Sequence, residues 1–392
     1  MMNTKCKTFN VLSIDGGGIR GIIPAMILKK IEKETKRPIH DLFDLIAGTS
    51  TGGIIALALT MPDCNGNPKH SAKDLVNLYK YQGHRIFNRS DLYKNLSFNG
   101  YILRKYPTGG IKNVLRDFFG DTCLSQALTD VLIPSYDMQG TRLYWKDWKE
   151  YKEGNKDSFR RKGGHPRFFK SHQAKQCNLP QENYLMWKVA HATAAAPTFF
   201  APVNTEFTPH DDKPCENLIE TLIDGGIFAN NPAMCAYAEA KRMLNEKAKE
   251  LEEKIKENEL DENERDKRKS ELNEIEEKKI FIVSLGTGHL TNILDPGIAK
   301  IWGKFQWVVP LLKNIIFDGA SDTVNYQLKQ LLDEKMYYRL QPFLPESCDE
   351  MDNVNENNLK DLQEEATSFM ENNEDLINSM IERLTEVESQ NT

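Results

Sequence analysis

The first sixty residues alternate short apolar runs with glycine-rich turns. Apolar runs at 9–14 and 42–47 have the length and composition of buried strands, and helical patterns follow them at 22–31 and 53–59. Strands that alternate with helices in this way form parallel sheets whose faces are covered by the helices. The pattern therefore predicts an α/β fold.

Residues 246–279 depart from this pattern. Of these 34 residues 24 are charged, while the apolar residues Leu244, Ala248, Leu251 and Ile255 keep a 4-3-4 spacing. Such a segment is typical of a helical hairpin or short coiled coil with a largely solvated surface. We expect it to protrude from the core as an insertion, either as a solvated extension or as an arm that docks a partner.

Residues 346–392 form a second distinct segment, with 14 acidic and 2 basic residues. Its apolar residues fall on helical faces and are Leu362, Ala366, Phe369, Met370, Leu376, Ile377, Met380, Ile381 and Leu384. We therefore expect a main domain over residues 1–345, which contains the 246–279 insertion. An acidic helical extension over residues 346–392 should pack back on that domain.

The formal net charge of −6 argues against a nucleic-acid-binding protein. The two charged segments account for this value, because the rest of the chain carries a net charge of +10. Within it, residues 142–175 hold 11 basic and 4 acidic residues among several aromatic ones. This composition suits the anionic headgroups of a membrane surface, although a single-stranded nucleic-acid groove or a solvated loop would use the same residue types.

The first ten residues contain no apolar segment of the kind found in secretory signals, and no uncharged apolar run reaches 18 residues. The seven cysteines are scattered and never spaced as Cys-x-x-Cys, which indicates free thiols with neither a disulfide framework nor a zinc site. We therefore expect a cytoplasmic protein that associates peripherally with membranes. Export by a specialised, non-classical route leaves no such mark and stays open.

The sequence Gly16-Gly17-Gly18-Ile19-Arg20-Gly21 matches the pattern G-x-G-x-x-G between a strand and a helix. A dinucleotide-binding fold would need an acidic residue at the end of the next strand, but residues 48–52 there read Gly-Thr-Ser-Thr-Gly. The loop instead favours a site in which backbone N–H groups, unobstructed by side chains, point at an anionic group.

Residues 48–52 match the pattern G-x-S-x-G, which places a nucleophilic serine on a sharp turn between a strand and a helix. Gly48 and Gly52 remove the Cβ atoms that would collide in such a turn. The position of the motif, after an apolar run and before a helical pattern, agrees with this interpretation. We expect Ser50 to be the nucleophile, and an ordinary glycine-rich turn is the alternative.

A serine hydroxyl is a poor nucleophile until a base accepts its proton. Two later apolar runs, 218–223 and 280–285, predict further buried strands, and each leads to a candidate base. Asp224, which two glycines follow, ends the first run, and His289 lies shortly after the second. Both a Ser50–Asp224 pair and a Ser50–Asp224–His289 triad are therefore available from the residues alone.

Five motifs occur in the order found in the patatin-like phospholipases, which this chain resembles from about residue 9 to about residue 345. The motifs are Asp15 to Gly21, Gly48 to Gly52, Ala192 to Phe199, Asp224 to Gly226 and Ser284 to Gly288. Residues 299–303 and 318–328 also resemble the plant patatins. Together the motifs are highly specific.

The resemblance implies a three-layer α/β/α fold with a mostly parallel central sheet, to which the charged hairpin and the C-terminal helices are added. It also implies that Ser50 is the nucleophile and that Asp224 acts on it directly as the base, without a histidine. The implied oxyanion hole consists of Gly16, Gly17 and Gly18 beside Arg20. The remaining motif glycines are Gly21, Gly48, Gly52, Gly225 and Gly226. No metal or cofactor is implied, because the family is calcium-independent.

The resemblance thus implies a lipid acyl hydrolase of the phospholipase A or lysophospholipase type that cleaves phospholipid or lysophospholipid esters. Bacterial relatives suggest an alternative, a toxin or immune-effector phospholipase that stays inactive until a partner protein or a small nucleotide binds. A non-catalytic lipid-surface or storage protein is a weaker alternative, and no nucleic-acid partner is expected. The apolar stretch 301–317 is expected to cover the site or to form one wall of an acyl groove.

Overall fold

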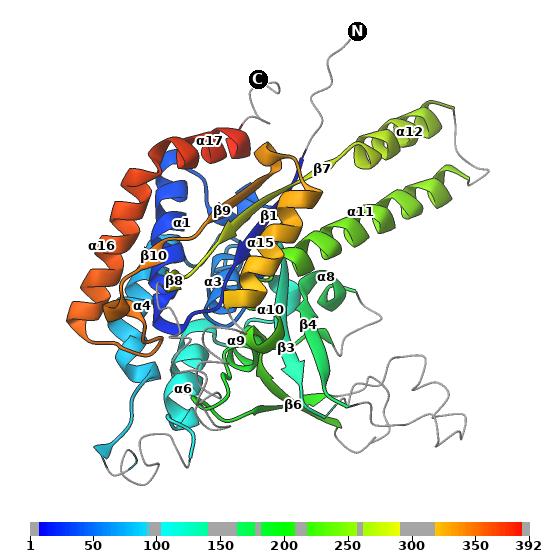
Figure 1. Cartoon of the computed structure of the whole chain (residues 1–392). Coiled ribbons are helices and arrows are strands. Elements are labelled where there is room, and N and C mark those ends of the chain that lie inside the picture. The colour runs from blue at the N-terminus through cyan, green and yellow to red at the C-terminus, as the bar shows by residue number, and fades with distance from the viewer. Residues whose placement is uncertain are drawn as a thin grey trace, which may run out of the picture.

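A mixed sheet of eight strands runs through the centre of the molecule in the order β5-β6-β3-β2-β1-β7-β9, with β4 paired to β3 (Figure 1). The structure is a computed structural model and describes residues 8–91, 93, 103–139, 163–176, 182–207, 218–256, 262–290 and 318–385. The strands are β1 Thr8–Ile14, β2 Leu45–Gly48, β3 Asp130–Asp137, β4 His165–Lys170, β5 Val203–Phe207, β6 Leu218–Asp224, β7 Lys279–Leu285 and β9 Tyr337–Leu340. A separate parallel pair joins β8 (His289–Leu290) to β10 (Phe343–Leu344).

Strands β3, β2, β1, β7 and β9 are parallel, whereas β4, β5 and β6 form an antiparallel extension at one side. β1 lies between β2 and β7, so that Ile14 pairs with Gly48 on one side and with Leu285 on the other. The carboxyl ends of these three strands therefore meet at one edge of the sheet. Loops that carry function in open α/β sheets gather at this edge.

Helices cover both faces of the sheet. Successive residues of each central strand point to opposite faces, so apolar side chains on both faces have to be buried. Leu12 and Ile46 join a large core on one face, while Val11 and Leu45 join a second core on the other. The first face is covered mainly by α1 (Ile22–Thr35), α3 (Thr51–Leu59), α4 (Ala72–Ile86), α6 (Thr108–Phe119) and α9 (Met186–Thr193), and the second by α11 (Ala233–Ile255) and α15 (Gly319–Leu331). The expected three-layer, mostly parallel α/β fold is confirmed.

The second strand is shorter than the apolar run 42–47 predicts. Residues Ile39–Leu42 form a short helix, α2, and β2 begins only at Leu45. Pro38 precedes that helix and suits its start, because the fixed φ of proline favours a helix N-terminus over a strand. The following helix, α3, begins at Thr51, two residues before the predicted start, because Ser50 itself makes the turn.

The charged insertion forms the expected helical hairpin. α11 extends beyond the sheet and lies beside α12 (Glu262–Glu276), so that the two helices project from the body as an arm (Figure 1). The first turns of α11 bury Ala233, Ala236 and Ala240 against the sheet, whereas residues 245–256 are exposed or half-buried. The arm is therefore anchored at its root and solvated toward its tip.

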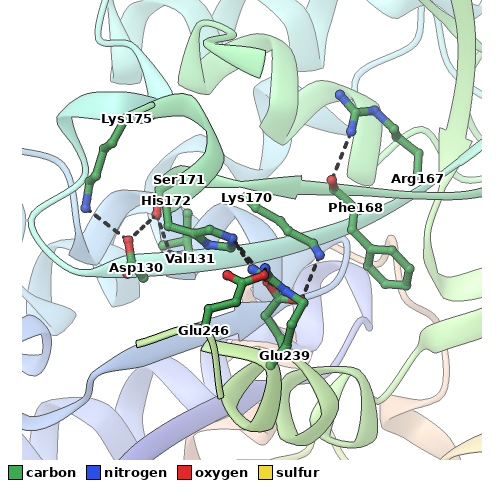
Figure 2. Close-up of polar contacts among 11 residues, drawn as sticks. Asp130, Val131, Arg167, Phe168, Lys170, Ser171, His172, Lys175, Glu239 and Glu246 are labelled. Carbon is green, nitrogen blue, oxygen red and sulfur yellow. Dashed lines mark hydrogen bonds and ion pairs between the residues drawn. The ribbon is translucent and has the colours of Figure 1, made fainter. Parts of the chain in front are cut away.

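A polar network fixes the root of the arm to the antiparallel part of the sheet (Figure 2). Glu239 of α11 is 6% exposed, and its carboxylate contacts the Lys170 Nζ at 2.7 Å and the His172 Nε2 at 3.2 Å. Arg242, one turn further along α11, contacts the same carboxylate at 2.6 Å. Because three cationic or hydrogen-bonding groups surround one buried carboxylate, the network holds α11 in a single orientation on the body.

The acidic extension forms two helices, α16 (Glu356–Asn372) and α17 (Glu374–Thr385), which pack beside α1 (Figure 1). Most of the apolar residues that the sequence placed on helical faces are buried or half-buried there. Leu376 is the exception, because its side chain is 41% exposed. The Tyr338 hydroxyl of β9 lies 3.1 Å from the Ser379 hydroxyl and adds a polar link between the extension and the sheet.

No helix within the described ranges has the length and apolar composition needed to cross a bilayer. The basic aromatic stretch at 142–175 falls outside the described residues for most of its length, and the apolar stretch 301–317 falls outside them entirely. The expectations for these two segments therefore stay predictions.

Candidate active site

Ser50 occupies the sharp turn that the G-x-S-x-G pattern predicts. It lies between the end of β2 and the first residue of α3, with φ 55° and ψ −120°, a strained conformation for a residue with a side chain. A Cβ atom on Gly48 would lie 2.1 Å from the Gly52 carbonyl oxygen, and one on Gly52 would lie 2.2 Å from the Ile14 carbonyl oxygen. The turn can therefore form only because both flanking residues are glycines.

The turn is held by a hydrogen bond that sequence reasoning did not find. The Ser50 backbone N–H donates to the Thr193 hydroxyl at 3.0 Å, and that hydroxyl in turn donates to the Pro134 carbonyl oxygen at 2.5 Å. Thr193 is the last residue of α9 and belongs to the motif of small residues at 192–199. The sequence of that motif does not show whether Thr193 positions another residue or only packs. Its role becomes visible only in the structure, where Pro134 of β3 and Ser50 lie beside it.

Asp224 ends β6 directly beside Ser50. Its side chain is 5% exposed, and its Oδ1 accepts the Gly226 backbone N–H at 2.7 Å. Burial raises the pKa of the Asp224 carboxyl to about 7, although hydrogen bonds from the Ser50 side chain and the Gly226 N–H oppose the rise. The carboxylate is thus a stronger base than an ordinary aspartate, and it is hydrogen-bonded to the hydroxyl that it would deprotonate.

The described residues do not assemble the triad. His289 lies in β8, where its backbone N–H donates to the Pro342 carbonyl oxygen at 2.8 Å and its ring contacts the Phe343 ring. Neither His289 nor any other histidine of the described ranges hydrogen-bonds Ser50 or Asp224. His191 is buried on α9, and burial lowers the pKa of its imidazole to about 4. The geometry therefore favours a direct Ser50–Asp224 pair.

The glycine loop lies against the turn. A Cβ atom on Gly16 would be 3.3 Å from the Ser50 Cβ and 2.5 Å from the Asn230 Oδ1, so the loop backbone approaches the serine closely. The Gly16 N–H donates to the Asn230 carbonyl oxygen at 3.1 Å and is not free to bind an oxyanion, contrary to the expectation for Gly16. Among the described residues none accepts the N–H of Gly17 or Gly18. Within the described part of the chain, the N–H groups of Gly17 and Gly18 are therefore available as hydrogen-bond donors.

Neighbouring chain segments fix the loop on both sides. The Thr287 hydroxyl donates to the Gly16 carbonyl oxygen at 2.6 Å. Gly18, Arg20 and Gly21 belong to a short 3-10 helix, Gly18–Gly21, that leads into α1. Gly21 packs against Thr51 and Tyr79, because a Cβ at this position would lie within 2.7 Å of both side chains. Gly225 follows Asp224 and packs against the backbone of Pro134 in the same way.

A buried ion pair holds the start of the loop. The Arg339 guanidinium of β9 contacts Asp15 at 2.9 Å and 2.5 Å in a bidentate arrangement, and Asp15 is 1% exposed. The same guanidinium donates to the hydroxyls of Ser284 and Ser321 at 2.8 Å and 3.1 Å. Burial by itself lowers the pKa of Arg339, but the charge of Asp15 outweighs it and raises that pKa. Burial is also the main cause that raises the pKa of Asp15, and the Arg339 charge opposes that rise.

Arg20 is buried within the loop, with 3% of its side chain exposed. Burial lowers the pKa of its guanidinium, and the charges of Asp318 and Asp349 oppose this change. Within the described part of the chain, its Nε and Nη1 atoms have no hydrogen-bond partner. The side chain thus lies beside the loop as expected, while its contribution to an oxyanion hole stays a prediction.

The fold and the geometry define the chain as an α/β protein with a serine–aspartate site at the carboxyl edge of its parallel strands. A sequence model described as "Patatin-like phospholipase" matches residues 12–237, more than half of the chain. The chain belongs to the patatin-like phospholipase family.

Curated relatives agree with this assignment. Patatin-like protein 2 from Oryza sativa subsp. indica is 30% identical over 391 residues, which cover 94% of this chain and 85% of that protein. Patatin-like protein 3 from Arabidopsis thaliana is 31% identical over 365 residues, covering 84% and 73%. "Probable inactive patatin-3-Kuras 1" from Solanum tuberosum is 30% identical over 360 residues, covering 86% and 81%. Because that relative is named as inactive, family membership alone does not establish turnover.

Among solved structures, VipD from Legionella pneumophila aligns with 93% of this chain and 67% of its own, with a TM-score of 0.29 and 11% sequence identity.

Proposed function

We propose that this protein is a serine-dependent lipid acyl hydrolase of the phospholipase A or lysophospholipase type. The observation that carries the proposal is the Asp224 carboxylate, which is buried, hydrogen-bonded to the Ser50 side chain and raised in pKa to about 7. A base of this strength is matched to proton transfer near neutral pH. The family match supports an ester of a lipid as the substrate class.

In the proposed reaction Asp224 accepts the Ser50 hydroxyl proton while the serine oxygen attacks the acyl carbonyl carbon. The N–H groups of Gly17 and Gly18 stabilise the resulting oxyanion, and donors of this kind typically contribute about 3–4 kcal/mol each. When the tetrahedral intermediate collapses, Asp224 returns the proton to the leaving alcohol oxygen and Ser50 keeps the acyl group. Asp224 then deprotonates a water molecule that attacks the acyl-enzyme, which releases the fatty acid and restores the serine.

The experiment combines covalent labelling with product analysis. A fluorophosphonate probe should label the purified protein, and mass spectrometry should show fatty acid released from mixed phospholipid and lysophospholipid liposomes. Both signals should disappear in Ser50→Ala and persist in Ser368→Ala, which removes an exposed hydroxyl on α16. Labelling that survives Ser50→Ala would place the nucleophile elsewhere.

The same liposome assay addresses regulation and membrane contact. Hydrolysis only in the presence of cell extract would favour an effector that needs an activator, and absence of both labelling and hydrolysis would favour a non-catalytic lipid-surface protein. We propose peripheral contact with anionic lipid, supported by the net charge of +10 outside residues 246–279 and 346–392. Turnover should accordingly be faster on liposomes that contain anionic lipid than on zwitterionic ones.

A further inference from the structure

The chain between the sheet and α16 crosses the glycine loop. The Met351 carbonyl oxygen accepts the Ile19 backbone N–H at 2.8 Å, in the middle of the loop. Gly18 has a φ of +60°, and a Cβ atom there would lie 2.2 Å from the same carbonyl oxygen. The third glycine of the loop is thus required by the approach of this C-terminal segment, which belongs to the acidic extension.

The next residue, Asp352, ties that segment to the body. Its side chain is 5% exposed, and its Oδ2 accepts the Tyr106 hydroxyl at 2.6 Å and contacts the Lys105 Nζ at 2.5 Å. Burial is the main cause that raises the pKa of Tyr106, so its hydroxyl keeps the proton that it donates. One carboxylate therefore receives two donors from residues that are adjacent in sequence.

Residues 105 and 106 are themselves bound to the motif that holds the catalytic pair. The Lys105 N–H donates to the Thr198 carbonyl oxygen at 2.7 Å, and the Tyr106 N–H donates to the Phe199 carbonyl oxygen at 2.9 Å. Earlier in the same motif, Thr193 accepts the Ser50 N–H and the Ala195 carbonyl oxygen accepts the Asp224 N–H at 3.0 Å. These hydrogen bonds, together with the chain segments 193–199, 105–106 and 351–352, thus link the serine and its base to the glycine loop.

We propose that Asp352 is a positioning residue that fixes the glycine loop relative to Ser50, so that the acidic extension is a working part of the active site. The proposal rests on the proposed function, because it assigns the loop N–H groups to the oxyanion. Asp352 acts only through Met351 and the loop, and it contacts no reacting atom. Loss of its two bonds should let the Gly17 and Gly18 donors move away from the oxyanion position, where displacements of about 1 Å can cost about 100-fold in rate.

The principal test is Tyr106→Phe, which removes one donor to Asp352 and keeps the ring. The ring remains packed against Phe87 and Phe200, whose centroids lie 5.5 Å and 5.8 Å away. We expect kcat on lysophospholipid to fall by about 10- to 100-fold while KM stays within about twofold, because the loop donors act mainly in the transition state. Asp352→Asn should lower kcat in the same way.

Tyr338→Phe provides a matched control. It deletes the same atom from a tyrosine that also links the body to the acidic extension, but through Ser379 of α17 and not through Met351 or Asp352. Its melting temperature reports what one such bond contributes to stability, and its kcat should match that of the unaltered protein. A fall in kcat of equal size in Tyr106→Phe and Tyr338→Phe would overturn the proposal, because it would reflect general loosening of the extension.

Hydrogen–deuterium exchange supplies a readout that does not depend on turnover. In Tyr106→Phe the peptide that contains residues 16–21 should exchange faster than in the unaltered protein, and in Tyr338→Phe it should not. Unchanged exchange of this peptide in Tyr106→Phe would refute the positioning role even if the protein hydrolysed no lipid. Absence of hydrolysis with faster exchange would instead count against the proposed function alone.

Discussion

Two buried aspartates of this molecule share one local sequence pattern and have opposite surroundings. Asp15 follows β1 and precedes three glycines, whereas Asp224 ends β6 and precedes two. Asp15 faces the Arg339 guanidinium in a bidentate ion pair, with two serine hydroxyls nearby. Asp224 faces no cation among the residues that the structure describes, and its hydrogen-bond partners there are the Ser50 side chain and the Gly226 N–H.

The difference shows that a distant residue decides what a buried carboxylate does. Arg339 neutralises Asp15 and turns it into a structural anchor for the glycine loop. Burial raises the pKa of both carboxyls, but the Arg339 charge opposes the rise at Asp15, whereas only hydrogen bonds oppose it at Asp224, whose pKa is raised to about 7. Asp224 therefore stays a carboxylate that can accept a proton near neutral pH. The pattern Asp-Gly-Gly only allows the backbone to approach closely. Whether the aspartate anchors a loop or can accept a proton depends on whether a cation lies beside it.

The largest effect should follow substitution of Asp224, the proposed base. Asp224→Asn keeps the shape of the side chain and an acceptor for the Gly226 N–H, but an amide cannot take the Ser50 proton. Release of fatty acid from liposomes should fall by about 10²- to 10⁴-fold. Asp117→Asn, which changes an exposed aspartate, is the control and should keep full activity. Comparable turnover by Asp224→Asn would exclude Asp224 as the base.

Asp224→Asn should also stabilise the fold at high pH. The folded protein binds a proton at Asp224 up to about pH 7, whereas the unfolded chain releases it near pH 4, so this group makes stability fall as pH rises between those values. The variant should therefore gain on the order of 1–4 kcal/mol in free energy of unfolding above pH 7, and the gain should vanish below about pH 4. Urea denaturation at pH 4 and pH 8 measures it.

Substitutions in the Asp15–Arg339 pair should mainly lower the stability of the fold. Arg339→Met leaves Asp15 buried without its cation, which should cost about 3–5 kcal/mol in free energy of unfolding at neutral pH. Arg85→Met is the matched control, because Arg85 pairs with Asp117 in solvent and its loss should cost about 1 kcal/mol or less. The double variant Asp15→Asn, Arg339→Met should recover part of the loss in the same denaturation experiment. A cost equal to that of Arg85→Met would show that the buried pair is not ionised.

The pH profile should sharpen the contrast. Only the ionised form of Asp224 can accept a proton, so kcat/KM should fall about tenfold per pH unit below about pH 7 and level off above it. Asp15 contacts Arg339 and not Ser50, so it should take no part in the proton transfer that this profile reports. Initial rates on a neutral, soluble lysophospholipid analogue give the profile without titrating a membrane surface. A flat profile down to pH 5 would contradict the raised pKa.

The smallest effect should follow substitution of Ser321, which contacts Arg339 beside the ion pair. Ser321→Ala removes the hydroxyl that accepts an Arg339 N–H at 3.1 Å but leaves the bidentate pair with Asp15 intact. The free energy of unfolding should fall by about 1 kcal/mol with activity retained. Thermal unfolding of Ser321→Ala and Arg339→Met, measured side by side, tests which variant is less stable. A larger loss of stability in Ser321→Ala would contradict the prediction.

The sequence identifies residues whose role depends on local backbone geometry. The strained turn at Ser50 and the placement of Asp224 could be predicted because glycines mark them and short apolar runs precede them. The partners that complete the site could not be predicted in this way. Arg339 reaches Asp15 only because β9 pairs with β7, which pairs with β1, and no local pattern reports that order.

The same limit explains the other residues that were missed or misjudged. Asn230 takes up the Gly16 N–H, and Met351 binds the glycine loop, through backbone carbonyl oxygens that every residue possesses. Backbone contacts between distant segments leave no mark in residue type. The strand start predicted at residue 42 failed for a related reason, because an apolar run does not show where the short helix Ile39–Leu42 stops and the strand begins.

The position of Met351 on the glycine loop has a consequence for protein synthesis. The loop leaves the ribosome early, whereas the segment that binds it follows more than 300 residues later, which takes on the order of tens of seconds at ordinary elongation rates. During that time neither Arg339 nor Met351 is present to order the loop. A nascent or prematurely terminated chain therefore lacks the contacts that hold this loop, so any activity that depends on the loop should appear only when translation is nearly complete.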